Sequence, residues 1–131
     1  MKRTTALTIA LSIITAGILL SCAAPEAAVY SDPTSTIFTT VNSEFTIGIP
    51  ANPTTGYQWA EEHNASMLSL VSSEYKPSKQ AKNVVGAGGT QYFKFKALKA
   101  GTAIISFTYK RAGDPIVADQ TAFNVVIEQS K

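Results

Sequence analysis

The stretch TQYFKFKAL, residues 90–98, alternates large apolar side chains with polar ones. Phe93 and Phe95 would lie on one side of an extended chain, with the intervening lysine on the other. A period of two residues is typical of a β-strand with one buried face and one solvated face. This stretch therefore predicts a half-buried strand.

The same alternation recurs along the chain, with turn-forming residues between the repeats. Seven stretches show it, at about 36–41, 44–49, 57–61, 67–75, 90–98, 102–110 and 120–128. Seven short strands predict an all-β fold, an immunoglobulin-like antiparallel β-sandwich. The chain has one cysteine, so apolar packing must hold the two sheets together. We expect Trp59 to be a core anchor rather than a contact surface.

The N-terminus carries the features of a secretory signal. Lys2 and Arg3 precede a short apolar run that ends in Leu-Leu-Ser-Cys at Cys22. The run is shorter than the roughly 20 apolar residues that cross a bilayer. Its ending resembles the lipobox of bacterial lipoproteins, in which the cysteine becomes the lipidated first residue; the alternative is a stray thiol. We expect a signal peptide at 1–21, a lipidated Cys22 with a flexible tether at 22–35, and one domain at 36–131.

A lipidated Cys22 would anchor the protein in the cell envelope, because each buried CH₂ group contributes about 0.8 kcal/mol. Ala23 follows Cys22 where an aspartate would favour the inner membrane. By analogy with Gram-negative sorting, this favours the outer membrane, facing the periplasm. We expect membrane association through this anchor.

Composition excludes several classes of function. Removing residues 1–21 takes away two of the 11 basic residues and leaves nine against nine acidic ones. No basic stripe appears, so we expect no nucleic-acid binding. His63 is the single histidine and is interpreted as a solvated loop residue, while Glu61 and Glu62 would point to opposite faces of a strand. We therefore expect no catalytic residue, no metal site and no cofactor.

Three connections carry most of the glycines, prolines and unusual polar residues. If successive strands run antiparallel, the connections at 50–56, 76–89 and 111–119 emerge at the same end of the sandwich. Loops on a rigid scaffold are where binding sites are usually placed. This end is the candidate binding surface.

The first of these connections contains NPTTGYQW, residues 52–59. Pro53 restricts its own φ and biases the preceding residue, and Gly56 permits a positive φ. Thr54 and Thr55 would then stand on a constrained crest with few rotamers to lose. On these grounds the crest is either a recognition surface or a turn whose threonines only face water. Tyr57 and Trp59 are expected to fasten it to the core.

The motif resembles the Asn-Pro-Thr-Thr-Gly-Tyr-x-Trp signature of the chagasin-like inhibitors of cysteine peptidases. A second family motif, Gly-x-Gly-Gly, is present at residues 86–89. The third, Arg-Pro-aromatic, is degraded: Arg111 is in register, but Ala112 and Gly113 replace the proline and the aromatic. The similarity spans about Thr36 to Glu128.

The resemblance implies reversible inhibition of papain-like cysteine peptidases, the cell's own or foreign, by three loops that block the cleft without being cut. The peptidase-binding residues it implies are Asn52, Pro53, Thr54, Thr55, Gly56, Tyr57, Gly86, Ala87, Gly88, Gly89 and Arg111. We expect a monomer whose affinity and targets differ from the family norm, since the third motif has lost its aromatic anchor. The alternative is a cell-envelope binding or adhesion module that uses sheet edges or faces and has no peptidase target.

Overall fold

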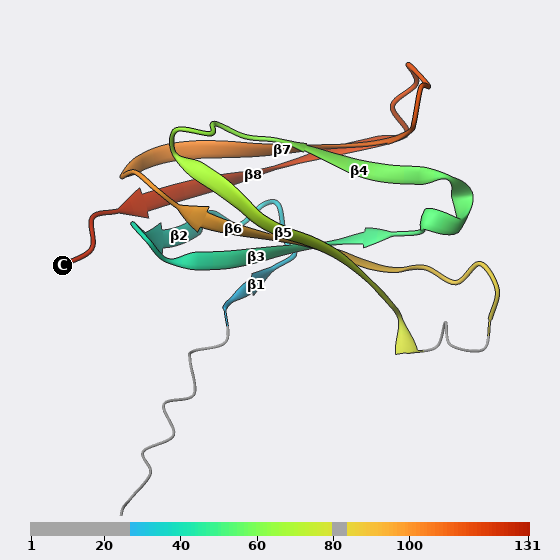
Figure 1. Ribbon diagram of the computed structural model, residues 1–131, viewed down its shortest axis with the longest axis horizontal. Helices are drawn as coiled ribbons and strands as arrows, with labels where there is room; N and C mark the ends of the chain where they lie inside the picture. The colour runs from blue at the N-terminus through green and yellow to red at the C-terminus, as the bar shows by residue number, and fades with distance from the viewer. Residues whose placement is uncertain (1–26, 80–83) are drawn as a thin grey trace, which may run out of the picture.

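A computed structural model describes residues 27–79 and 84–131 as two four-stranded β-sheets packed face to face (Figure 1). Sheet A has the strand order β1-β3-β6-β5, and sheet B has the order β2-β8-β7-β4. The strands are β1 (Val29–Tyr30), β2 (Ile37–Thr40), β3 (Glu44–Ala51), β4 (Tyr57–Glu62), β5 (Leu68–Pro77), β6 (Gly89–Ala97), β7 (Gly101–Arg111) and β8 (Asp119–Glu128). The prediction of an all-β sandwich is confirmed, and each of the seven predicted strands is present. In the described ranges, no helix is both long and apolar enough to span a membrane.

The core lies between the sheets and is built from the apolar positions of the alternating pattern. Phe93 of sheet A contacts Phe107 of sheet B, with ring centroids 4.9 Å apart. Phe45 stacks on Phe95 within sheet A at 5.8 Å. Each fully buried phenylalanine stabilises the fold by about 1.5–3 kcal/mol. The buried apolar residues are Ile37, Phe45, Ile47, Ile49, Leu68, Phe93, Phe95, Ala97, Ala103, Ile105, Phe107, Phe123, Val125 and Ile127.

Trp59 packs against this core from β4, at the edge of sheet B. Its ring lies edge-on to Phe107 at 6.5 Å and tilted against Tyr109 at 4.7 Å. Its Nε1 donates a hydrogen bond to the carbonyl oxygen of Pro50, 2.9 Å away on β3. The predicted anchoring role is confirmed, and the indole also ties the two sheets together at this point.

Strand direction departs from the prediction at two edges of the sandwich. The pairs β3–β6, β5–β6, β4–β7 and β7–β8 are antiparallel. The pairs β1–β3 and β2–β8 are parallel and are exceptions to the expected antiparallel pairing. Alternation shows which face of a strand is buried, but it carries no information about which distant strand will be its neighbour.

β1 lies inside the segment that we expected to be a tether. Thr46 of β3 donates its backbone N–H to the carbonyl of Ala28 at 3.0 Å, and Tyr30 sits edge-on to Phe45 at 6.4 Å. The structure therefore differs from the expected tether in this part, because residues 29–30 join sheet A. A strand of two residues shows no period, which is why the sequence did not reveal it. Cys22 and the expected signal peptide at 1–21 lie outside the described residues.

The strand registers place three connections at one end of the molecule. Ala51, at the end of β3, is opposite Gly89, which is in turn opposite Pro77 of β5. In sheet B, Tyr57 at the start of β4 is opposite Arg111 at the end of β7. The β3–β4, β5–β6 and β7–β8 connections thus emerge together, at the right of Figure 1, as predicted. We call this the three-loop end, and name its loops L1 (52–56), L2 (78–88) and L3 (112–118).

Candidate functional site at the three-loop end

L1 folds as a single turn of 3₁₀-helix, Pro53–Thr55. Thr55 donates its N–H to the carbonyl of Asn52 at 3.2 Å, and Gly56 donates its N–H to the carbonyl of Pro53 at 3.1 Å. Proline suits the start of such a turn because its nitrogen has no hydrogen to leave unpaired. Gly56 closes the turn with a φ of +81°, which confirms the expected positive φ. The crest is therefore a closed, rigid turn.

The two threonines are exposed, but their hydroxyl groups are bonded within L1. Thr54 Oγ1 donates to Asn52 Oδ1 at 2.5 Å, and Thr55 Oγ1 donates to the carbonyl oxygen of Asn52 at 2.6 Å. Tyr57 N–H in turn donates to Thr55 Oγ1 at 3.4 Å. These bonds hold both side chains in one rotamer. Each threonine thus offers a partner chiefly its methyl group and its backbone, at little ordering cost.

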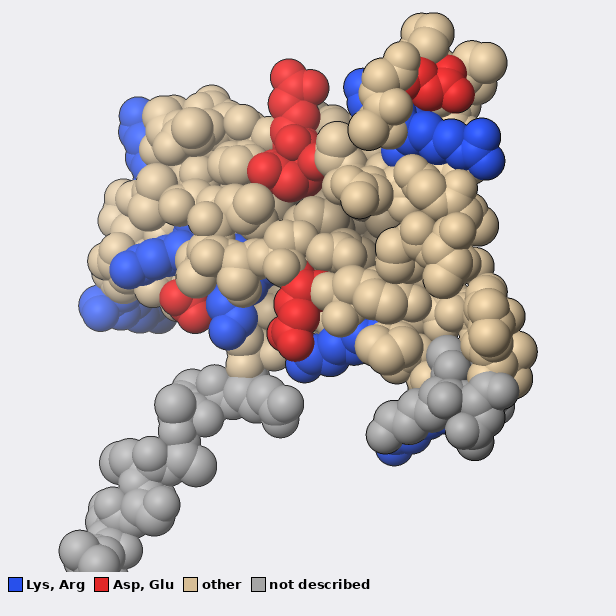
Figure 2. Space-filling view, turned by 45° about the vertical axis from the view of Figure 1, so that its right-hand side comes forward, with Lys and Arg blue, Asp and Glu red and all other residues tan. Residues whose placement is uncertain are grey.

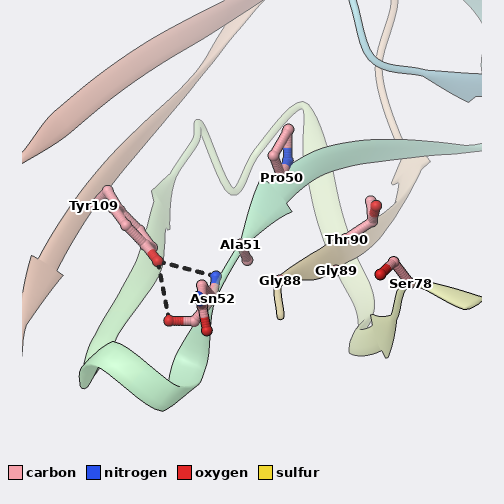
Figure 3. Close-up of a pocket in the computed structure, with 8 residues that line it drawn as sticks. All are labelled: Pro50, Ala51, Asn52, Ser78, Gly88, Gly89, Thr90 and Tyr109. Atoms are coloured by element: carbon pink, nitrogen blue, oxygen red, sulfur yellow. Dashed lines mark hydrogen bonds between the residues drawn. The ribbon is translucent and has the colours of Figure 1, made fainter. Parts of the chain in front are cut away.

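Asn52 connects L1 to the other parts of the site (Figure 3). Its backbone N–H donates to the Tyr109 hydroxyl of β7 at 3.1 Å. Its side-chain Nδ2 donates to the carbonyl of Gly86 in L2 at 2.9 Å. Asn52 was expected to shape the loop and to bind the peptidase, and Tyr109 was not among the expected site residues. The alternating pattern of β7 could have indicated this role, because it turns Tyr109 toward the inner face near the end of the strand. A tyrosine hydroxyl at such a position needs a hydrogen-bond partner.

The glycines of the second motif have structural reasons that the sequence did not reveal. Gly86 has a φ of +85°, the left-handed region that favours glycine. A Cβ on Gly89 would lie 2.2 Å from the carbonyl oxygen of Lys76, and one on Gly88 would lie 3.1 Å from that of Ala51. The absent side chains thus allow β3, β5 and β6 to approach one another, in addition to any room they leave for a partner.

A groove of about 430 Å³ runs between L1 and L2. Figure 3 shows backbone and small side chains along most of it, with Tyr109 at one side. Its lining residues are Pro50, Ala51, Asn52, Ser78, Gly88, Gly89, Thr90 and Tyr109. Such a surface can be approached closely by the main chain or a small side chain of a partner.

The strand ends next to L1 and L3 contact each other through Tyr57, the first residue of β4, and the last residues of β7. The Arg111 guanidinium lies over the ring of Tyr57, 4.6 Å from its centroid, and this ring stacks on Tyr109 at 5.4 Å. A cation–π contact at an exposed site contributes about 0.5–1 kcal/mol. Tyr57 therefore fastens L1, as expected, and Arg111 is held beside it. In Figure 2 the three-loop end faces forward on the right, with charged side chains near its upper corner, a basic one at its lower edge and uncharged residues between them.

Two expectations concern residues away from this site. His63 was expected to be solvated, but its side chain is only 14% exposed: its ring is edge-on to Phe95 at 5.4 Å and Nδ1 contacts Glu61 Oε2. That expectation is wrong because the chain just after β4 still covers the core. Glu61 is half-buried and Glu62 exposed, so the two carboxylates do lie on opposite faces. In residues 27–79 and 84–131, no three of His, Cys, Asp and Glu form a possible metal site.

Comparisons with known proteins agree on one family. Residues 39–127 match the family described as "Chagasin family peptidase inhibitor I42". Chagasin of Trypanosoma cruzi is 30% identical over 100 residues, which cover 72% of this chain and 88% of chagasin. The cysteine protease inhibitor EhICP2 of Entamoeba histolytica has a similar crystal structure, with a TM-score of 0.64 and 25% identity, covering 79% of this chain and 99% of that one. PbICP-C, solved in complex with falcipain-2, shares the fold at a TM-score of 0.52 and 12% identity, with 80% and 100% coverage.

Proposed function

Because the chain belongs to the chagasin family of peptidase inhibitors, it is an inhibitor of papain-like cysteine peptidases and not an enzyme, and we propose that it closes the active-site cleft with L1, L2 and L3. The observation that carries this proposal is that L1 is bonded to L2, and that the strand ends next to L1 and L3 are in contact. Asn52 bonds L1 to L2 at 2.9 Å, and Arg111 lies over Tyr57 at 4.6 Å. A linked surface loses little conformational freedom on binding, which favours affinity.

L1 is the part that covers the catalytic cysteine in this proposal, with Thr54 and Thr55 at its crest. A peptide is cut only when its carbonyl reaches attack geometry and can be polarised by oxyanion donors. Here the carbonyl of Asn52 accepts hydrogen bonds from the N–H and the Oγ1 of Thr55, and that of Pro53 accepts one from Gly56. These carbonyls are engaged inside a closed turn. L1 therefore fills the site without presenting a bond that can be cleaved.

L2 and L3 bind on either side of L1. The backbone just before Gly89 lies along the substrate groove of the peptidase, where the lack of side chains allows close approach. Gly89 itself is paired with Ala51 and Pro77 and fixes the position of this segment. Gly86 and Ala87 form the turn that leads into this segment. Arg111 contacts the opposite wall of the cleft. The mechanism uses no group beyond these residues.

An inhibition assay tests the proposal. The full chain, held in mild detergent, is titrated against papain and several cathepsin L-like enzymes with a fluorogenic substrate. We expect reversible inhibition below micromolar concentration and an intact inhibitor mass after long incubation. The absence of inhibition at micromolar concentration across the panel would overturn the proposal. Cleavage within L1 in step with peptidase turnover would overturn the account of how L1 resists hydrolysis.

We also propose that Cys22 carries lipid and anchors the inhibitor in the cell envelope, at an outer membrane facing the periplasm if the cell is Gram-negative. The support is the signal-like run that ends in Leu-Leu-Ser-Cys, followed by Ala23. Metabolic labelling with radioactive palmitate tests this. We expect label on the chain in the membrane fraction and none on Cys22→Ser; equal labelling of both chains would refute the assignment.

A further inference from the structure

L3 lacks the aromatic side chain that the third family motif would place after Arg111. Between the end of β7 and the start of β8, the loop reads Ala-Gly-Asp-Pro-Ile-Val-Ala. Its large apolar side chains are Ile116 and Val117, five and six positions beyond Arg111. Whether L3 still offers an apolar contact depends on where these two residues lie.

Exposed aliphatic side chains are concentrated at the three-loop end. Among the described residues, nine large apolar side chains are exposed, and four of them belong to L2 or L3. These four are Val84, Val85, Ile116 and Val117. Single exposed apolar residues are common, but several together on one surface mark an interaction site. The apolar side chains of L3 thus lie at the same end of the molecule as the surface used in the proposed function.

Hydrogen bonds hold Ile116 in its exposed position. Asp114 donates its N–H to the carbonyl of Arg111 at 3.2 Å, and Asp114 Oδ1 accepts the N–H of Ile116 at 2.9 Å. Ala118 N–H donates to the carbonyl of Tyr109 at 2.8 Å and closes the loop. In this conformation Ile116 is 68% exposed and Val117 45% exposed. The conformation of the loop therefore exposes Ile116 to solvent. Ile116 is not part of a strand, so its exposure is not a consequence of side chains alternating between two faces.

We propose that Ile116 and Val117 are the apolar contacts of L3 and determine which papain-like peptidases are inhibited. This inference rests on the proposed function and assigns to it a residue pair outside the family motifs. Branched aliphatic groups fill a hollow on an apolar wall, whereas a flat aromatic ring stacks on a surface. The favoured targets are peptidases whose cleft wall, next to the Arg111 contact, is apolar and hollow. Desolvating Ile116 there supplies part of the binding energy that the missing aromatic would have given.

The test compares Ile116→Ser/Val117→Ser with a matched control, Ile104→Ser. Ile104 is 56% exposed, but it lies on the solvent face of β7, away from the three-loop end. We expect the double variant to raise Ki by about tenfold or more against the best-inhibited peptidase, as loss of an apolar anchor does. The control should leave Ki unchanged, and the thermal midpoints of both variants should stay close to that of the unmodified chain.

Selectivity is the readout that separates a specificity role from general weakening. The increase in Ki for Ile116→Ser/Val117→Ser should differ among papain and the cathepsin L-like enzymes. The single variant Ile116→Leu, which keeps an aliphatic side chain, should retain most of the affinity of the unmodified chain. Thr55→Glu, which alters L1, should weaken inhibition of all of them. If the unmodified chain inhibits and the double variant has a Ki within twofold of it on every enzyme, this inference alone is overturned. An unmodified chain that inhibits none would overturn the proposed function as well.

Discussion

Asn52 shows how much of the site depends on one side chain. Its Oδ1 accepts the hydroxyl of Thr54, its Nδ2 donates to the carbonyl of Gly86, and its backbone N–H donates to Tyr109. Aspartate would share the acceptor but lacks the amide donor to L2, and alanine lacks both. The asparagine of the motif is therefore explained by its bonds within the inhibitor, without reference to a peptidase.

Replacing Asn52 by alanine should disconnect L1 from L2. We expect the free energy of unfolding to fall by about 1–2 kcal/mol, since two side-chain hydrogen bonds are lost. Inhibition should weaken by about tenfold because the loops must then be ordered on binding. Urea denaturation and Ki measurements check both values.

Asn64→Ala is the control for that experiment. Asn64 Oδ1 accepts the N–H and the hydroxyl of Ser66, just beyond β4 and away from the three-loop end. This variant should lose comparable stability and keep its Ki. Equal loss of inhibition in the two variants would contradict a specific role for Asn52 in ordering the loops.

Gly89 and Gly113 are glycines for two different reasons, lack of space for a side chain at Gly89 and a positive φ at Gly113. An alanine Cβ at Gly89 would lie 2.2 Å from the Lys76 carbonyl, whereas one at Gly113 would meet nothing within 4 Å. Gly113 has a φ of +76°, so alanine there should cost about 1 kcal/mol in backbone strain. Gly89→Ala should lower the free energy of unfolding by more than about 2 kcal/mol, since two strands must separate. Urea denaturation of both variants tests this order, and equal losses would show that the β5–β6 approach is not tight.

Asp32 makes a defined contribution to the pH dependence of stability. Hydrogen bonds from the hydroxyl and N–H of Thr34 and from the hydroxyl of Ser35 lower the pKa of its carboxyl group. A lowered pKa in the folded state stabilises the fold above the ordinary pKa of the carboxyl, and this stabilisation is lost as pH falls through the lowered value. Urea denaturation between pH 6 and pH 2 should show Asp32→Asn with a weaker loss of stability in acid. Identical pH profiles would contradict this.

At the scale of elements, the period of two residues was enough to predict seven strands, because each buries one face in a shared core. The same pattern contains nothing about β1, which is two residues long, or about the parallel pairing of β2 with β8. It also did not show that L1 is a 3₁₀ turn or that His63 covers Phe95. The strand pairings and the position of His63 depend on contacts between segments far apart in sequence. The turn of L1 is set by local bonds, from Thr55 to Asn52 and from Gly56 to Pro53, which the strand pattern does not describe.

The parts of the candidate site that could be predicted from the sequence are those where proline or glycine restricts or frees the backbone. Pro53 and Gly56 pointed to a constrained crest, and the strand count placed the three loops at one end. The Asn52–Gly86 and Tyr57–Arg111 contacts arise only when distant segments meet in space. The exposure of Ile116 follows from the hydrogen bonds of L3, which the alternating pattern does not describe. The residues of L2 needed the resemblance, since a glycine-rich stretch alone fits many turns.

β1 should contribute to stability and not to inhibition. Tyr30→Ala removes a half-buried ring from Phe45 and weakens the pairing that Thr46 makes with Ala28. We expect the free energy of unfolding to fall by about 1–2 kcal/mol and the amide of Thr46 to exchange faster with deuterium. Ki should not change, because β1 lies beside the middle of β3. A large change in Ki would show that β1 influences the three-loop end.

The molecule as a whole is a sandwich of two sheets with the proposed contact surface at one end. If that end occupies the cleft, the catalytic cysteine of a bound peptidase is shielded from small electrophiles. Excess inhibitor should therefore slow alkylation of the peptidase by iodoacetamide, measured by mass spectrometry, while Thr55→Glu at the same concentration should not. Alkylation at the free rate in a saturated complex would mean that inhibition acts from outside the cleft.

The direction of β1 has a consequence for a chain held by lipid at its N-terminal side. β1 runs parallel to β3, and β3 runs toward the three-loop end, so the chain enters β1 from the far side of the sandwich. Seven residue steps separate Cys22 from Val29, so the distance between them is at most about 24 Å. With Cys22 in the bilayer, the domain would stand close to the membrane with its loops pointing outward. A captured peptidase would then sit on the side of the inhibitor remote from the lipid, free of collision with the surface.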